Sequence, residues 1–422
     1  MARRIWVIGV AVVAFASSAC QDASANAVTT PPDSTIEIST SQTTTTDTKA
    51  PATSTTTPSS TSTSTTSTTT STSTTTPATR TATTDARPFN GAAFDSVVAA
   101  ATVDVGDLAA GAAVIRYGEV LHTGSFGMEN PFENIAATAR TRFRLASVSK
   151  MFTSVAIMQL VEAGAIKLDV PFVDQLNVKG PFADPRVAAI TVRQLLSHTS
   201  GFSASHGIFF GHGVDNWHQA AQSALGQVLM FDPGTAFKYS NTNFCLLGLL
   251  LESVTGQSFE AAIRERVLKP IGIKAHLAPT VDTVHGDALH VSGPGRNYME
   301  TLGPAGGWAA TPTDIAKLAA ALRADPSGTP LLDQTAVDAM RVPVPVPVEV
   351  PPPANGWSYG LGMMLFGDGS WGHTGTIEST HSVVVNRPDG LTVAIMISGK
   401  LPYNTDDLLP VIDAAVAAAF AG

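Results

Sequence analysis

Residues 144–153 read Arg-Leu-Ala-Ser-Val-Ser-Lys-Met-Phe-Thr, and this stretch decides how the rest of the chain is interpreted. It predicts a short extended segment followed by a helix, because apolar residues then recur every three or four positions from Met151 to Val161. Gly164 supplies a stop signal for that helix. We therefore expect Ser147 to lie at a helix N-terminus.

Ser147 and Lys150 are spaced for nucleophilic catalysis. Free backbone N–H groups at a helix N-terminus favour negative charge beside Ser147. Lys150 lies one turn further along the same face, so its amine can reach the Ser147 hydroxyl and act as the base that a serine nucleophile needs. The alternative is an ordinary helix start with a surface lysine. Only Lys150 among the lysines of the chain has a serine three residues before it, so abundance does not explain the pattern.

Residues 1–19 have the pattern of an export signal. Two arginines open it, and the apolar run at 5–16 is too short to span a bilayer. Small residues then precede Cys20, so we expect lipidation of Cys20 and an exported protein held to the membrane by its lipid anchor alone, facing the cell wall or periplasm. The alternative is cleavage after Ala25 and secretion. Labelling with a palmitate analogue that is lost in Cys20→Ala distinguishes the two.

Residues 20–84 are predicted to form a disordered stalk. From about residue 26 the composition is dominated by Thr, Ser, Pro and Ala, and 59–76 contains only Ser and Thr. Such a stretch has too little apolar surface to offset the entropy of ordering, and as a flexible coil its ends would lie on the order of 40 Å apart. It either lifts an enzyme away from the membrane or acts as a simple tether.

Composition and charge exclude several function classes. The formal net charge is −9 and no basic block occurs, which argues against nucleic acid as a partner and against an electrostatic grip on anionic lipid. If Cys20 is lipidated, Cys245 is a lone cysteine in an apolar helical run and is interpreted as a buried small apolar residue. His198, His206 and His212 lack paired helical spacing, so we expect no metal site and no cofactor.

Residues 85–422 are long enough for a large core. Strand patterns lie towards both ends and helical patterns between them, which predicts an α+β fold. In it, residues 85–164 and 355–422 build one antiparallel sheet around an inserted, mostly helical region at about 165–340. The expected helices are 192–197, 216–230, 244–254, 258–268, 313–324 and 406–420. The expected strands are 111–116 and 119–124, joined in a hairpin, and 359–365, 370–374, 382–386 and 391–398.

Two further motifs follow the Ser-x-x-Lys pattern. Tyr239-Ser240-Asn241 precedes a predicted helix, and His373-Thr374-Gly375 lies in a predicted strand. With these motifs in this order, the chain resembles the penicillin-recognising serine hydrolases: class C β-lactamases, serine D-Ala-D-Ala carboxypeptidases and related esterases. An earlier copy, His122-Thr123-Gly124, does not fit the order. The loops 195–201 and 305–308 also match, and the resemblance extends from about Phe89 to Ala421.

The resemblance implies a role for each motif residue. Ser147 would be the nucleophile, with Lys150 and Tyr239 sharing proton transfer, and which of these two is the base stays open. Asn241 would present its amide to the substrate carbonyl or to Lys150. The fold implied is that of the β-lactamases and transpeptidases.

The strand that carries the third motif is expected to bind the substrate. Gly375 would leave the strand edge bare, so that a peptide-like substrate lies alongside as an added strand. The backbone N–H groups of Ser147 and Thr376 would form the oxyanion hole. A partly charged His373 would attract a substrate carboxylate that the Thr374 and Thr376 hydroxyls also bind. The alternative is that His373 only hydrogen-bonds Tyr239 or a neighbouring hydroxyl.

We expect an exported, monomeric serine hydrolase that acts on small-molecule or peptide substrates, D-Ala-D-Ala-type peptides or esters above all. The motif histidine stands where most β-lactamases have lysine, and residues 376–379 lack a glycine that many relatives carry; the pattern is closest to the carboxypeptidase branch. The alternatives are a class C-like β-lactamase and a catalytically silent penicillin-binding or wall-sensing protein. The motifs of α/β-hydrolases and zinc metallopeptidases are absent from the sequence.

Overall fold

The computed structural model describes residues 88–102, 108–211, 213–290, 292, 295–323, 331–344, 356–399 and 404–421. The predicted export signal, the predicted lipidation site Cys20 and the predicted stalk lie outside these residues and stay predictions. His212 also lies outside them. Within the described ranges, no helix combines the length and apolar character that crossing a membrane requires.

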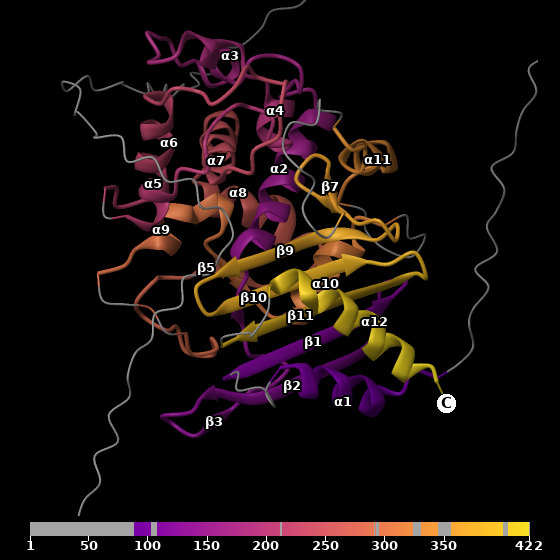
Figure 1. Ribbon diagram of the computed structural model, residues 1–422. Coiled ribbons are helices and arrows are strands. Elements are labelled where there is room, and N and C mark those ends of the chain that lie inside the picture. The colour runs from indigo at the N-terminus through magenta and orange to yellow at the C-terminus, as the bar shows by residue number, and fades with distance from the viewer. Residues whose placement is uncertain are drawn as a thin grey trace, which may run out of the picture. The chain divides into compact units, whose positions relative to one another are not determined.

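An eight-stranded antiparallel sheet forms the centre of the domain (Figure 1). Its strands are β1 (Ala109–Arg116), β2 (Glu119–Asn130), β3 (Ile135–Ala136), β7 (Ser358–Tyr359), β8 (Met364–Leu365), β9 (Trp371–Ile377), β10 (Thr380–Asn386) and β11 (Leu391–Ser398). Their order is β3-β2-β1-β11-β10-β9-β8-β7, so β1 pairs directly with β11, with Ala109 opposite Ser398. The predicted sheet built from both ends of the domain is confirmed.

Local sequence explains the first hairpin and the central strands. The turn between β1 and β2 places Tyr117 and Gly118 at positive φ, 49° and 80°, as a tight two-residue hairpin requires. Every residue of β10 and β11 is buried, because helices cover both faces of the sheet there. Within these strands, 383–385 and 393–397 are accordingly apolar runs without alternation.

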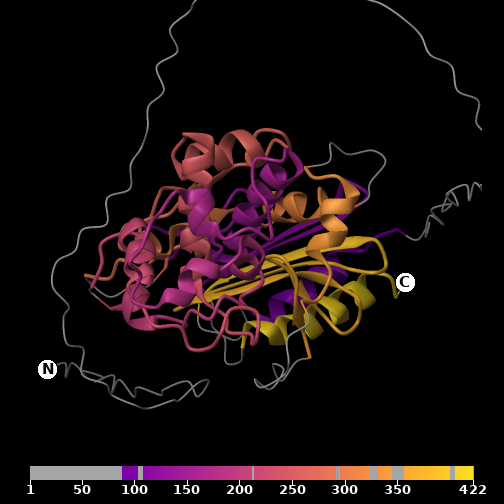
Figure 2. The ribbon, with the colours of Figure 1, turned by 90° about the horizontal axis from the view of Figure 1, so that it is seen from above.

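Two helices from opposite ends of the chain cover one face of the sheet. They are α1 (Gly91–Ala101), which was not predicted, and α12 (Leu408–Ala419), which follows a short 3₁₀ turn, η6 (Thr405–Asp407). Phe94 of α1 and Ile412 of α12 belong to the same buried cluster as Val114 and Ile395 of the sheet. Figure 2 shows the indigo and yellow helices together on this side, away from the other helices.

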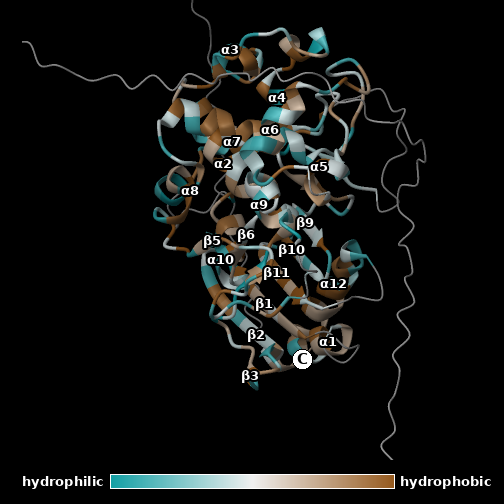
Figure 3. Ribbon diagram, turned by 90° about the vertical axis from the view of Figure 1, so that its left-hand side faces the viewer, coloured by the Kyte–Doolittle hydropathy of each residue, from teal (hydrophilic) through white to brown (hydrophobic). Residues whose placement is uncertain are grey.

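The helical region lies against the opposite face. Its central helices are α2 (Lys150–Glu162) and α7 (Asn241–Thr255), and α10 (Pro312–Ala320) packs on β1 and β11. Figure 3 shows the hydrophobic character of α7 inside this region. The remaining elements are α3 (Phe172–Leu176), η3 (Pro185–Ala189), α4 (Val192–Leu196), α5 (His206–Phe210), α6 (Trp217–Leu225), α8 (Phe259–Ile263), the π-helical turn η4 (Arg264–Leu268), α9 (Tyr298–Leu302), the 3₁₀ turn η5 (Gly303–Ala305) and α11 (Gln334–Met340).

Three further differences from the predicted elements concern α2, residues 359–365 and a second sheet. Helix α2 is buried on nearly all sides rather than along one apolar stripe, because α7 and α8 also pack on it. The predicted strand 359–365 is instead the hairpin of β7 and β8, since Gly362 adopts a φ of +77° between them. A second, three-stranded sheet was not predicted; its order is β4 (Phe143–Arg144), β6 (Trp308–Ala310) and β5 (Ala275–Leu277).

Candidate active site

A sharp change of chain direction presents Ser147 at the sheet. The three-stranded sheet fixes the segment that leads into Ser147, because β4 pairs with β6 and the Leu145 N–H donates to the Trp308 carbonyl at 2.8 Å. Ala146 then adopts a φ of +47° and starts the 3₁₀ turn η2 (Ala146–Ser149), which runs directly into α2. Ser147 is partly exposed although its neighbours Ala146 and Val148 are buried. The predicted helix N-terminus at Ser147 is therefore confirmed, with one 3₁₀ turn before the α-helix.

Lys150 is fully buried and points at Ser147. Its Nζ donates to Ser147 Oγ at 3.2 Å, to Asn241 Oδ1 at 2.8 Å and to the Ala305 carbonyl at 2.7 Å. None of these acceptors is a carboxylate, so no full negative charge offsets the loss of solvent. Burial accordingly lowers the pKa of the Lys150 amine to about 7. A substantial share of the amine is neutral at physiological pH and can accept a proton.

Tyr239 closes the other side of the Ser147 hydroxyl. Lys150 Nζ lies 4.9 Å from the centre of the Tyr239 ring, and the tyrosine hydroxyl is buried. Burial raises the pKa of the Tyr239 phenol, and the Ser147 hydroxyl offsets part of that shift. The phenol therefore keeps its proton at neutral pH. Ser147, Lys150, Tyr239 and Asn241 are brought together as the sequence predicts.

The His198 ring packs against the Tyr239 ring. The sequence assigns no role to His198. Its ring lies 4.2 Å from the Tyr239 ring, centre to centre, and is fully buried. Its Nδ1 accepts from the Ser240 backbone N–H at 3.2 Å and lies 3.1 Å from Asn243 Nδ2. Because Nδ1 accepts, the ring is neutral, and burial also lowers the pKa of His198 well below its usual value. The histidine of the loop 195–201 thus orders the Tyr-x-Asn motif.

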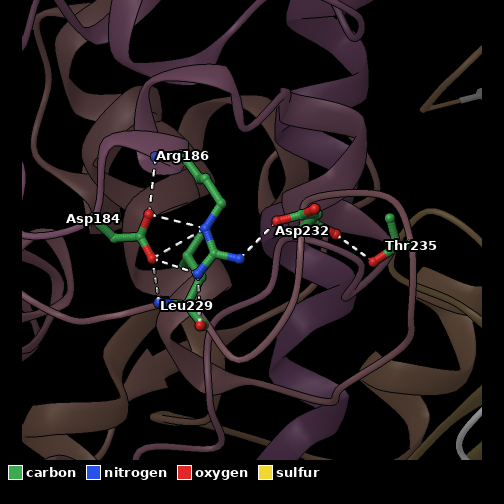
Figure 4. Close-up of polar contacts among 5 residues, drawn as sticks. All are labelled: Asp184, Arg186, Leu229, Asp232 and Thr235. Atoms are coloured by element: carbon green, nitrogen blue, oxygen red, sulfur yellow. Dashed lines mark hydrogen bonds and ion pairs between the residues drawn. The ribbon is translucent and has the colours of Figure 1, made fainter.

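The segments around His198 and before Tyr239 run side by side. Three backbone hydrogen bonds join them, from the N–H groups of Met230, Gly234 and Lys238 to the carbonyls of Gly201, Thr199 and His198. Figure 4 shows a polar cluster at the start of the second segment.

In this cluster the Asp184 carboxylate accepts from the Arg186 guanidinium and from the Leu229 N–H. Arg186 also donates to Asp232 at 2.7 Å and to the Leu229 carbonyl at 2.9 Å. Arg186 therefore holds Leu229 and Asp232, the two ends of the turn that leads into the segment before Tyr239.

Gly375 is needed for close packing, which differs from the predicted reason for it. A Cβ at this position would lie 2.5 Å from the Leu145 carbonyl oxygen and 2.8 Å from the Ser147 backbone nitrogen. Ser382 Oγ, which donates to the same Leu145 carbonyl at 2.6 Å, would lie 2.7 Å away. The glycine thus lets β9 lie directly against the backbone of the Ser147 turn, and no other side chain fits there.

Beyond β8, the edge of β9 has backbone groups without a partner among the described residues. β8 pairs only with Trp371 and Gly372 of β9. The Thr374 N–H points towards Met364 of β8, at 3.3 Å from its sulfur, so it faces away from β10. Because strand geometry repeats every two residues, the Thr376 N–H and C=O face the same edge, past the end of β8. The Thr376 N–H is thus directed to the side where an oxyanion hole with the Ser147 N–H was predicted.

The charge predicted for His373 is wrong. Its ring is buried, with Nε2 2.8 Å from the Tyr359 hydroxyl and Nδ1 2.6 Å from the Thr374 carbonyl. The carbonyl only accepts, so Nδ1 carries the proton and Nε2 accepts from Tyr359. Burial and the nearby Lys150 charge lower the pKa of His373 to about 3. The alternative, a neutral histidine bound to a neighbouring hydroxyl, describes the structure, with Tyr359 in place of Tyr239.

The hydroxyls of Thr374 and Thr376 also differ from the prediction. Gly375 faces Ser147, so the side chains on either side of it point to the opposite face of the sheet. Thr376 Oγ1 lies 2.5 Å from Thr405 Oγ1, in the turn before α12, and Thr374 Oγ1 lies 3.4 Å from the Met364 sulfur. These hydroxyls have partners within the protein, and only the backbone of these residues faces the site.

Among the described residues, Cys245 and the histidines form no site that could bind a metal ion. Cys245 is buried in α7 with a free thiol, as predicted. Within the described residues, no three His, Cys, Asp or Glu side chains are grouped so that they could hold a metal ion.

Comparison with known proteins agrees with this geometry. Residues 94–418 match the Beta-lactamase family. Penicillin-binding protein 4 of Amycolatopsis lactamdurans is 27% identical over 66% of this chain and 78% of its own length. A D-stereospecific amidohydrolase from Streptomyces sp. has a TM-score of 0.61 at 26% identity, covering 78% of this chain and 98% of that one.

The D-amino acid amidase of Ochrobactrum anthropi SV3, at 22% identity, has the same fold, with a TM-score of 0.64 over 78% of this chain and 98% of that one. The antiparallel sheet with its helical insertion is therefore the β-lactamase and transpeptidase fold. The match to most of the described domain shows that the chain belongs to the Beta-lactamase family of serine hydrolases.

Proposed function

We propose that this protein hydrolyses amides or esters of D-amino acids through an acyl-enzyme on Ser147. The observation that carries the proposal is the 3.2 Å contact from Lys150 Nζ to Ser147 Oγ, made by a buried amine whose pKa is lowered to about 7. A neutral amine beside a serine hydroxyl is the requirement for nucleophilic activation. Relatives named as a penicillin-binding protein and a D-stereospecific amidohydrolase support peptide-like, D-configured substrates, the D-Ala-D-Ala type among them.

In the acylation step, Ser147 Oγ attacks the substrate carbonyl carbon while its proton passes to Lys150. The carbonyl electron pair moves onto oxygen, where the N–H groups of Ser147 and Thr376 receive the negative charge. Collapse of this intermediate breaks the bond to the leaving amine or alkoxide, which takes up a proton. We assign this donation to the Tyr239 phenol, which Lys150 then reprotonates, because burial keeps the phenol protonated.

Deacylation repeats these steps with water. Lys150, neutral again, accepts a proton from the water that attacks the Ser147 ester, and the released Ser147 oxygen recovers a proton as the acid product leaves. Asn241 keeps the amine aimed at Ser147 through its 2.8 Å contact to Nζ. No metal or cofactor takes part in this scheme.

Covalent labelling tests the proposal. The purified domain is treated with a fluorophosphonate and, separately, with a fluorescent penicillin, and the adduct is located by peptide mass. We expect the added mass on Ser147, its loss in Ser147→Ala, and retention in Ser223→Ala, a control serine on the exposed face of α6. An absence of adduct with both probes would show a catalytically silent protein.

A further inference from the structure

An ion pair lies at the end of β9, past the proposed oxyanion position. Arg296 Nη2 donates to Glu378 Oε1 at 3.1 Å, and Arg296 Nη1 donates to the Phe210 carbonyl at 3.0 Å. Glu378 belongs to the turn after β9, Phe210 ends α5, and Arg296 precedes α9. The pair therefore joins the sheet to the helical region, and Figure 1 shows α5 and α9 beside this end of β9.

Glu378 occupies a backbone position that favours glycine. Its φ is +47°, in the left-handed region, where a Cβ costs conformational energy that glycine avoids. A side chain retained there at such a cost suggests a use for it. Only Oε1 of its carboxylate has a donor among the described residues, so Oε2 can accept from a ligand.

The direction of β9 decides which part of a substrate meets Glu378, and this step rests on the proposed function. A substrate lying antiparallel along the open edge, with its carbonyl oxygen at the Thr376 N–H, exchanges both hydrogen bonds with Thr376. Its own α-nitrogen then faces the Thr376 carbonyl. The amino end of the substrate runs towards the C-terminal end of β9, where Glu378 lies.

The distance and the charge suit a free ammonium group. Glu378 is two residues past Thr376, about 7 Å along an extended strand, a gap that the glutamate side chain and the ammonium group bridge together. The pKa of Tyr298, in α9, is raised chiefly by burial, and the negative charge of Glu378 adds to that rise. This agrees with a Glu378 carboxylate that points across the open edge of β9 towards α9. A longer acyl chain would run into the Arg296–Glu378 pair.

We propose that Glu378, held in place by Arg296, binds the free α-ammonium group of the acyl residue, so that the enzyme prefers aminoacyl amides and esters with an unblocked amino end. N-acylated substrates, including the longer acyl peptides of wall precursors, lose this contact and meet the ion pair. The protein would then remove groups from the carboxyl side of a single N-terminal residue.

A matched substrate pair tests this inference. kcat/KM is measured for D-phenylalanine amide and N-acetyl-D-phenylalanine amide, in wild type, Glu378→Gln and Glu260→Gln. Glu260, on α8, provides the control because it also forms an exposed ion pair, with Arg264 at the start of η4. We expect wild type and Glu260→Gln to prefer the unblocked amide at least tenfold. In Glu378→Gln we expect about a tenfold loss for the unblocked amide only, as for a charged hydrogen bond.

A second readout does not depend on turnover. Each amide is used to slow fluorophosphonate labelling of Ser147, which reports binding in the same site. Stronger protection by the unblocked amide, lost in Glu378→Gln, is expected. Equal protection by both amides, protection by neither, or an equal loss for both in the variant would overturn the role of Glu378. A wild-type protein that is not labelled at all would instead contradict the proposed acyl-enzyme.

Discussion

The tripeptide His-Thr-Gly occurs in two strands of the same sheet, and its two copies have different surroundings. In β2, His122 is partly exposed and its Nε2 lies 2.7 Å from Asp95 Oδ1. In β9, His373 is buried and bonded on both ring nitrogens. The three residues therefore carry no chemistry of their own. What distinguishes the second copy is its place opposite the Ser147 turn.

The two glycines show the same contrast. A Cβ on Gly124 would meet Asp95 Oδ1 at 2.5 Å and the Phe126 ring at 2.8 Å, both ends of side chains that can turn away. A Cβ on Gly375 would meet backbone atoms of Leu145 and Ser147, which cannot move without displacing the nucleophile. Close approach of two backbones, rather than turn formation, is the constraint on the second glycine.

Alanine at each glycine gives the largest expected difference. Gly375→Ala should lower the rate of Ser147 labelling by about 100-fold or more, comparable to the loss of an oxyanion donor, because the Ser147 N–H and β9 are pushed apart. Gly124→Ala should stay within about threefold of wild type. Circular dichroism checks that both variants fold. Equal rates in the two variants would contradict the close packing described for Gly375.

The pH profile sharpens the comparison of the two histidines. Lys150, with a pKa of about 7, must be neutral to accept a proton, so activity should rise with pH through about 7 and fall about tenfold per unit below it. His373, with a pKa of about 3, should add no step between pH 5 and 9. The labelling rate with an uncharged fluorophosphonate is measured across this range in wild type and in His122→Asn. A flat profile, or a step lost in His122→Asn, would contradict the assignment to Lys150.

Stability should show the smallest of these differences. His373→Phe leaves the buried Tyr359 hydroxyl without its acceptor and should cost about 1–3 kcal/mol in the free energy of unfolding. His122→Phe removes only a partly exposed pair and should cost about 1 kcal/mol or less. Urea denaturation measures both. The double variant His373→Phe/Tyr359→Phe should recover part of the loss, and no recovery would mean that the Tyr359 hydroxyl is satisfied by another group.

Parts of the site that depend on local geometry could be predicted from the sequence. Ser147 and Lys150 are one helical turn apart, so their contact follows from the helix alone. The helical pattern that follows Tyr239 and Asn241 predicts that they lie directly before a helix, and α7 begins at Asn241. The strands β1, β2, β10 and β11 were recognised from their apolar runs and turns, so the sheet and its inserted helical region were predicted as well.

Features that depend on distant residues could not be predicted. The charge of His373 is decided by burial and by Tyr359, which reaches it through the β7–β8 hairpin. The contribution of His198 comes from contacts to Ser240 and Asn243, on a different element. The strands of the small sheet are two or three residues long and show no alternation, so only pairing with one another makes them strands.

The pairing of β1 with β11 has a consequence for how this protein comes to be folded. Strand β1 pairs on its inner side with β11, the last strand of the described residues, so the sheet cannot close until nearly the whole described domain has been synthesised. Contacts between such distant segments slow folding, since a long loop must close before they form. Until then β1 exposes an unpaired edge of Ala, Val and Ile, which invites wrong pairing with other chains. A chain that stops short of β11 should therefore aggregate or be degraded rather than retain partial activity.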